Sequence, residues 1–84
     1  MEKFVALLSP EMDALLQEVA GKHGLDTTEQ RQSQGRWLLS SQDRDQLIDA
    51  VTLEFTATGL DADDEPNRRG LELEGLVDHL NILE

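Results

Sequence analysis

Apolar residues in the first part of the chain recur at the spacing of an amphipathic helix. The residues that share one face are Met12, Leu15, Leu16 and Val19. Ser9 precedes them as an N-cap hydroxyl, and Pro10 stands at the first helical position, where its missing N–H costs nothing. His23-Gly24 is a typical helix end, because glycine readily adopts the left-handed conformation that follows a last turn. The pattern predicts a helix over about residues 10–23.

Two further helical patterns occupy the C-terminal half. One predicts a helix over about residues 41–58, ended by Gly59, with an apolar face made by Leu47, Ile48, Val51 and Phe55. The other predicts a helix over about residues 67–82, with an apolar face made by Leu73, Leu76, Val77, Leu80 and Leu83. Gly75 inside it costs roughly 1 kcal/mol relative to alanine, which indicates either a close approach by another element or an incidental glycine. Packing of the two apolar faces would give an antiparallel helical hairpin.

Two short apolar segments, about residues 3–8 and 36–39, each lead into a predicted helix and are predicted to be strands. Pro10 disfavours a helical conformation at Ser9, which separates the first segment from the helix after it. Residues 26–35 are rich in Thr, Gln and Ser without an apolar face, and this is typical of a loop. We therefore predict one helix-dominated α+β domain over residues 1–84. Good helix formers near the N-terminus leave an all-α fold as the alternative.

Composition narrows the function classes. The chain has no cysteine, so disulfides, thiolate metal ligands and cysteine nucleophiles are excluded. No apolar run approaches the roughly 20 residues of a membrane helix, and no signal peptide is evident. No phosphate-binding loop, nucleophile elbow or other catalytic spacing is present. We expect a soluble, cytoplasmic protein that is not an enzyme, has no catalytic residues and needs no cofactor.

The negative charge is concentrated in the C-terminal half. Residues 43–84 hold twelve acidic side chains against Arg44, Arg68 and Arg69, a net charge of −9, whereas residues 1–42 carry only −2. A field of this sign repels nucleic acid and anionic membranes and attracts basic proteins. We therefore expect a basic protein partner, no direct contact with nucleic acid and no membrane binding.

The predicted partner-binding residues are of two kinds. Acidic side chains on the polar helix faces and in the connection between them would steer the partner and contact it at the rim: Asp45, Asp49, Asp61, Asp63, Asp64, Glu65, Glu74 and Asp78. Apolar residues outside the main helical stripes would anchor it: Leu53, Leu71 and Ile82. Self-association through the same apolar residues, giving a homodimer of structural role, is an alternative.

The acidic connection also has the outline of a calcium-binding EF-hand loop. Oxygen-bearing side chains fall at loop positions one, three, five, seven and twelve, namely Asp61, Asp63, Glu65, Asn67 and Glu72. Pro66 occupies the position where the loop needs glycine, and the two arginines that follow Asn67 place positive charge beside the proposed ion. A divalent-cation binder using residues 61–72 is therefore the alternative function from another class.

Three other side chains, Trp37, His23 and His79, could have a functional or a structural role. Trp37 could anchor an interface, but in a chain with so few aromatic residues we expect it in the core. We expect His23 to cap its helix while partly buried, and His79 to lie at the surface. Two unconnected histidines do not make a metal site, which needs three or four convergent ligands.

The stretch over residues 53–81, LEFTATGLDADDEPNRRGLELEGLVDHLN, resembles the C-terminal ends of small uncharacterised bacterial proteins. The match over residues 53–81 covers about a third of the chain, and its shared pattern is GLDxDxEPNxRGLxLE. The resemblance implies a recurring helical hairpin and no particular activity. In size and acidity the chain is also similar to immunity proteins that neutralise bacterial nuclease toxins and to phage inhibitors that mimic nucleic acid. That similarity implies an inhibitor that docks on a basic partner.

Overall fold

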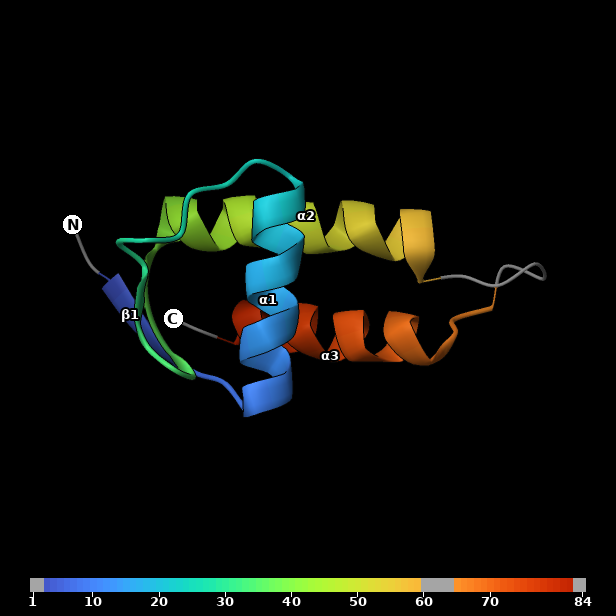
Figure 1. The fold of residues 1–84 in the computed structure, drawn as a ribbon, viewed down its shortest axis with the longest axis horizontal. Helices are drawn as coiled ribbons and strands as arrows, with labels where there is room; N and C mark the ends of the chain where they lie inside the picture. The colour runs from blue at the N-terminus through green and yellow to red at the C-terminus, as the bar shows by residue number, and fades with distance from the viewer. Residues whose placement is uncertain (1–2, 60–64, 83–84) are drawn as a thin grey trace.

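Three helices and a three-stranded antiparallel sheet make up the fold, as seen in a computed structural model that describes residues 3–59 and 65–82 (Figure 1). The elements in chain order are β1 (Lys3–Leu7), α1 (Pro10–Lys22), β2 (Arg31–Ser33), β3 (Arg36–Ser40), α2 (Ser41–Thr58) and α3 (Arg68–Asn81). The predicted helix-dominated α+β class is confirmed. The predicted helix bounds agree with the structure to within one residue at each end.

The sheet has the order β1-β3-β2, so β3 is its central strand. The predicted strands β1 and β3 pair regularly, with Phe4 opposite Leu39 and Ala6 opposite Trp37. Strand β2 corrects the expectation of a loop over residues 26–35, because residues 31–33 pair with β3 across the turn at Gly35, whose φ is +80°. This polar strand has no apolar alternation, so its backbone pairing left no hydrophobic pattern in the sequence.

Side-chain capping explains where the helices start. The Ser9 hydroxyl accepts a hydrogen bond from the Met12 amide at the start of α1. Ser40 and Asp43 form a reciprocal capping box at α2, and the Asn67 side chain accepts from the Gly70 amide at α3. Each cap satisfies a backbone N–H that has no partner inside its own helix.

Helices α2 and α3 run antiparallel as a hairpin, and α1 crosses one face of it (Figure 1). The backbones of the two helices come close at Gly59 and Gly70, where a Cβ on Gly70 would overlap the Gly59 carbonyl oxygen. At Gly75, an added Cβ would meet only the Met12 Cε atom, at 3.8 Å. The close approach considered for Gly75 therefore occurs at Gly70 instead.

The core lies where the sheet, α1 and the hairpin meet. Trp37 is fully buried, which confirms the prediction that it belongs to the core, and the predicted helix stripes supply most of the remaining buried leucines and valines. Leu83, predicted in the stripe of α3, lies outside the described residues. None of the helices in the described ranges combines the length and apolar character that a membrane crossing requires.

Candidate functional site

A surface pocket lies between the two helices of the hairpin. It has a volume of about 340 Å³, and all its lining residues belong to α2 or α3: Thr52, Phe55, Leu73, Glu74, Val77 and Asp78. Phe55 and Val77 are half-buried and pack against the core, so they form an apolar floor that is already held in place. Glu74 and Asp78 are exposed one helical turn apart on α3. We call this site the α2–α3 pocket.

The other predicted partner-binding residues fall on separate surfaces. Asp49 and Leu53 line a different pocket, which they share with His23 and Leu25. Leu71 lines a third pocket, between α1 and α3. Leu53, Leu71 and Ile82 are exposed, at 58%, 60% and 75% of their accessible surface, and Leu53 and Leu71 line different pockets.

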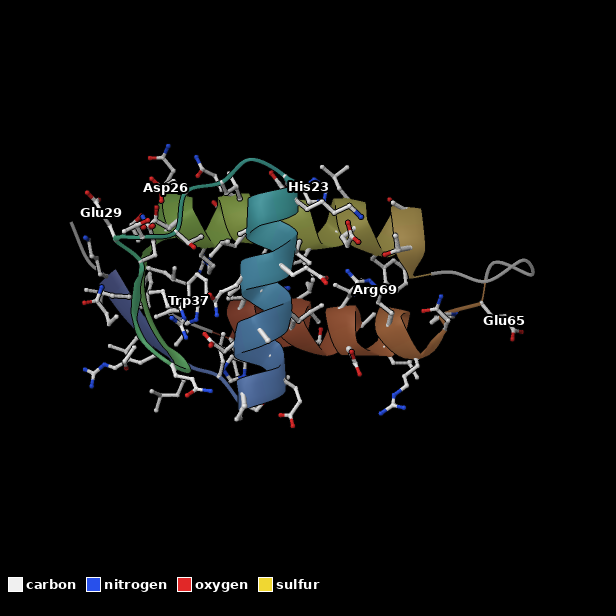
Figure 2. All side chains as sticks on the ribbon, in the orientation of Figure 1. His23, Asp26, Glu29, Trp37, Glu65 and Arg69 are labelled. Atoms are coloured by element: carbon white, nitrogen blue, oxygen red, sulfur yellow. The ribbon has the colours of Figure 1, made fainter. Side chains whose placement is uncertain are left out.

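The remaining predicted acids are placed as follows. Asp45 lies exposed on α2, with an oxygen 3.6 Å from Arg44. Glu65 is exposed beyond the end of the hairpin that is farthest from the sheet (Figure 2). Asp61, Asp63 and Asp64 lie outside the described residues.

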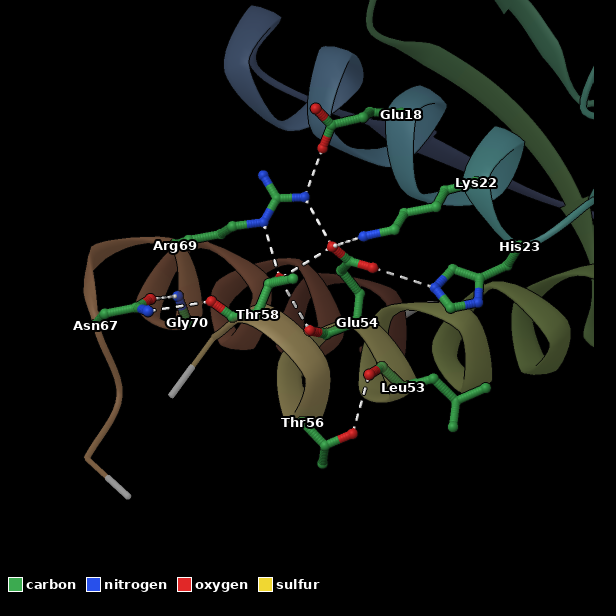
Figure 3. Close-up of polar contacts among 10 residues, drawn as sticks. All are labelled: Glu18, Lys22, His23, Leu53, Glu54, Thr56, Thr58, Asn67, Arg69 and Gly70. Atoms are coloured by element: carbon green, nitrogen blue, oxygen red, sulfur yellow. Dashed lines mark hydrogen bonds and ion pairs between the residues drawn. The ribbon is translucent and has the colours of Figure 1, made fainter. Parts of the chain in front are cut away.

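A buried carboxylate that the sequence did not single out joins all three helices. Glu54 of α2 is fully buried, yet it contacts charged groups from α1 and α3 (Figure 3). Lys22 Nζ lies 2.9 Å from Glu54 Oε2, Arg69 donates to the same oxygen at 3.0 Å, and His23 Nε2 lies 3.2 Å from Oε1. The Thr58 hydroxyl donates to Oε2 at 2.9 Å. Every carboxylate oxygen therefore has a partner, as a buried charge requires.

Arg69 extends this cluster to the surface. Its guanidinium also contacts Glu18 of α1 at 2.5 Å and donates to the Thr58 hydroxyl at 3.1 Å. Burial alone would raise the pKa of Glu54, but the hydrogen bonds from Lys22, Arg69, Thr58 and His23 outweigh it and lower that pKa to about 2. A carboxylate that stays ionised near neutral pH is not suited to act as a general acid.

Two sequence signals could have revealed Glu54. It occurs at the i+7 and i+3 positions from Leu47 and Val51, so it interrupts the buried face of α2 with a charge. A charge on a buried face needs a partner, and the chain has few cations to supply one. In the sequence Arg69 follows the acidic connection, whereas in the structure it pairs with Glu18 and Glu54.

A second buried acid, Asp13 of α1, joins that helix to the sheet. The Trp37 indole donates to Asp13 Oδ1 at 2.7 Å, and Arg31 of β2 makes a two-pronged contact at 3.1 and 2.9 Å. The Arg31 hydrogen bonds, helped by the one from Trp37, hold the pKa of Asp13 below its usual value against the effect of burial. This contact explains how a polar strand such as β2 is held on the sheet.

Two residues of the EF-hand outline, Asn67 and Glu72, have other roles in the structure. The Asn67 oxygen caps α3 and its amide nitrogen donates to the Thr58 carbonyl at 3.0 Å, while Glu72 pairs with Arg68 at 3.8 Å. Within the described part of the chain, no group of three or more His, Asp or Glu side chains could hold a metal ion. Asp61 and Asp63 lie outside that part.

His23 caps α1 and is partly buried, as predicted, and it also contacts Glu54. His79 lies in the last turn of α3 with intermediate exposure.

Comparisons with known proteins return no relative: no family model matches the chain, and neither does any curated protein or solved structure.

Proposed function

We propose that this protein binds a basic segment of another protein in the α2–α3 pocket and catalyses no reaction itself. The observation that carries the proposal is an apolar floor of Phe55 and Val77 beside two exposed carboxylates, Glu74 and Asp78. An apolar side chain flanked by lysine or arginine has the complementary chemistry. Where the bound segment belongs to a functional surface of its protein, binding would inhibit that protein.

The two kinds of lining residue have different roles in this proposal. Exposed carboxylates mainly speed association and select cationic partners, since solvent screens their contribution to affinity. Burial of an apolar side chain in the pocket supplies the larger share of affinity, at roughly 25 cal/mol per Å² removed from water. The charges at Asp45 and Asp49 add to the long-range field without lining the pocket.

The contacts of Glu54 support a binding role because they fix the helices that form the pocket. Its carboxylate is fully occupied by partners from three helices. A rigid hairpin held in this way can present a preformed pocket, and a preformed site loses less conformational entropy on binding.

The test is an NMR titration of the isotopically labelled protein with a designed basic peptide. The probe is a helical peptide of leucine and lysine with its leucines on one face, and the control is the same composition in scrambled order. We expect saturable shifts that centre on Thr52, Phe55, Val77 and Asp78, and weaker binding of the scrambled peptide. Shifts spread over the whole acidic surface for both peptides would contradict the proposal.

Charge-matched variants separate the pocket from the general field. Glu74→Gln with Asp78→Asn removes two charges at the pocket, and Asp45→Asn with Asp49→Asn removes two charges elsewhere on the hairpin. All four side chains are exposed, so both variants should fold. We expect the pocket variant to weaken binding about tenfold, equivalent to about 1.4 kcal/mol, and the control to weaken it far less. Equal weakening would show that only net charge matters.

A further inference from the structure

A second pocket on α3 lies between that helix and α1, and its volume is about 220 Å³. Its apolar lining is Met12 and Leu15 of α1 together with Leu71 of α3, and Gly75 of α3 also lines it. Leu15 is buried and Met12 packs half-buried against the core, so the α1 side is held in place, whereas Leu71 is exposed. We call this site the α1–α3 pocket.

Packing inside the chain does not explain why residue 75 is a glycine. A glycine in the middle of a helix costs roughly 1 kcal/mol relative to alanine. Among the described residues no backbone lies close enough to require it, since an added Cβ would meet only the Met12 Cε atom, at 3.8 Å. Because Gly75 and Met12 both line the α1–α3 pocket, a longer side chain at position 75 would occupy part of that pocket. The glycine therefore leaves room for a ligand.

The polar side chains of the α1–α3 pocket favour a cation. They are Ser9, Glu11 and Glu72, all of them exposed, and two of the three are carboxylates. Arg68 lies 3.8 Å from Glu72, but its side chain is 95% exposed. So open an ion pair contributes little, and it leaves the Glu72 carboxylate able to accept a second cation.

Of the two long cationic side chains, lysine matches this lining better than arginine. The four-carbon stem of lysine can lie along the apolar side chains while its ammonium group offers three donors and no acceptor. Arginine pairs best with a single carboxylate in a two-pronged contact. In the α1–α3 pocket the oxygens belong to separate side chains, with Ser9 and Glu11 on one side and Glu72 on the other.

The two pockets of α3 open on the same face of that helix. Leu71, Glu74, Gly75 and Asp78 occur at the i, i+3, i+4 and i+7 positions, which fall on one side of a helix. Glu74 and Asp78 line the α2–α3 pocket, whereas Leu71 and Gly75 line the α1–α3 pocket. A single segment that lies across α3 can therefore contact both pockets.

We propose that the basic segment bound in the α2–α3 pocket extends across α3 and inserts a lysine side chain into the α1–α3 pocket. This inference rests on the proposed function for the identity of the partner. The lysine stem packs against Met12, Leu15 and Leu71 above the bare backbone of Gly75, and its ammonium group pairs with Glu11 and Glu72. Two anchors on one segment strengthen binding, because the second anchor binds intramolecularly once the first is in place.

The first test is an NMR titration of the intact protein with its methionine methyl groups labelled. The probe is the helical peptide of leucine and lysine described above, and the control is the same peptide with every lysine replaced by arginine. We expect the lysine peptide to shift the Met12 methyl and the Gly75 amide saturably, together with Val77. The arginine peptide carries the same charge and should shift Val77 while moving Met12 far less. Equal Met12 shifts with both peptides would overturn the selection of lysine.

This titration separates the two proposals. Saturable shifts at Val77 with no change at Met12 would overturn the lysine site and leave the proposed function standing. Shifts at Met12 with no change at Val77 would support the lysine site and overturn the proposed function. A Met12 shift that follows the protein concentration without peptide would assign the α1–α3 pocket to a second copy of the chain and overturn the inference.

The second test fills the pocket from within. Gly75→Leu adds a side chain that occupies the α1–α3 pocket, and Gly21→Leu adds the same side chain to α1 where nothing lies within 4 Å of the new Cβ. We expect Gly75→Leu to weaken binding of the lysine peptide at least about tenfold and Gly21→Leu to leave it nearly unchanged. Gly75→Ala, which should stabilise the helix, gives a smaller loss of about threefold. Unchanged binding by folded Gly75→Leu and Gly75→Ala, with Trp37 fluorescence reporting folding, would overturn the proposal.

Discussion

At the scale of single residues, Glu54 is the side chain on which most of the polar contacts between helices converge. Its partners differ in exposure: Lys22 is half-exposed, whereas Arg69 and His23 are only about a third and a quarter exposed. Because Glu54 is buried, separating any one of these partners from its carboxylate costs free energy. The cluster therefore constrains how α1 crosses the hairpin.

Replacement of this carboxylate tests its contribution to stability. In Glu54→Gln the shape is kept but the charge that holds Lys22 and Arg69 is lost, so we expect the free energy of unfolding to fall by about 2 kcal/mol. Glu18→Gln is the matched control, because Glu18 contacts the same Nη2 atom of Arg69 as Glu54 does but is 58% exposed. Its cost should stay below about 1 kcal/mol. Urea denaturation followed by Trp37 fluorescence measures both, and similar values would contradict a central role for Glu54.

The pKa of Glu54 predicts how stability depends on pH. In the folded protein this pKa is about 2, below the value of 4.5 for an ordinary glutamate, so the unfolded chain binds the proton more readily. The stabilisation is complete above about pH 4.5 and is lost as the pH falls toward about 2. Urea denaturation at a series of pH values should therefore show a steep loss in this window. In Glu54→Gln the free energy of unfolding should fall less steeply over this window. Some loss should remain, because the pKa of Asp13 is also lowered in the folded protein.

At the scale of elements, the hairpin depends on a contact between two glycines. Gly59 ends α2 and its carbonyl accepts a hydrogen bond from the Asn67 amide at 2.9 Å, while Gly70 lies in the first turn of α3. The Phe55 ring also lies where a side chain on Gly70 would extend. The two helices can approach this closely only because neither residue has a Cβ.

A pair of glycine substitutions tests this contact. Gly70→Ala would place a methyl group against the Gly59 carbonyl, so we expect a loss of about 1–3 kcal/mol in the free energy of unfolding. Gly75→Ala adds the same methyl group to the same helix where only Met12 is near, and it should stabilise the protein by up to about 1 kcal/mol through helix propensity. Thermal denaturation followed by circular dichroism measures both. A neutral Gly70→Ala would mean that the hairpin can open at no cost.

Sequence patterns predicted these elements unevenly, for physical reasons. Helices α1 and α2 begin at serine caps and carry periodic apolar faces, so their bounds follow from local chemistry. Strand β2 is held by pairing with β3 and by the contact of Arg31 with Asp13, which are long-range interactions that leave no local periodicity. Gly75 and Gly70 occur in the same helix, and only the position of Gly59 in the fold shows which of the two meets a backbone.

At the scale of the whole molecule, the strands and the helical hairpin differ in charge. The three strands contain cations and no acid, whereas α2 and α3 contain seven acids; acids also lie at the sheet end, where Figure 2 shows Asp26 and Glu29. The sequence alone shows the excess of acids in the C-terminal half, because charge can be counted directly. It could not predict that Glu74 and Asp78 share a pocket while Asp45 and Asp49 do not, because that depends on how the two helices are rotated about their axes.

The excess of eighteen acidic over seven basic residues predicts that salt stabilises this protein. Lys22, Arg31 and Arg69 already pair with buried carboxylates that salt screens poorly, so added ions mainly reduce repulsion among the exposed acids. We expect about 1 kcal/mol of added stability between about 20 mM and about 300 mM NaCl, which raises the melting temperature by roughly 4–8 °C in a domain of this size. Calcium and magnesium compared at equal ionic strength separate screening from specific binding. Equal shifts indicate screening alone, whereas a much larger shift with calcium that Asp61→Asn abolishes would support an ion site in the 61–72 segment.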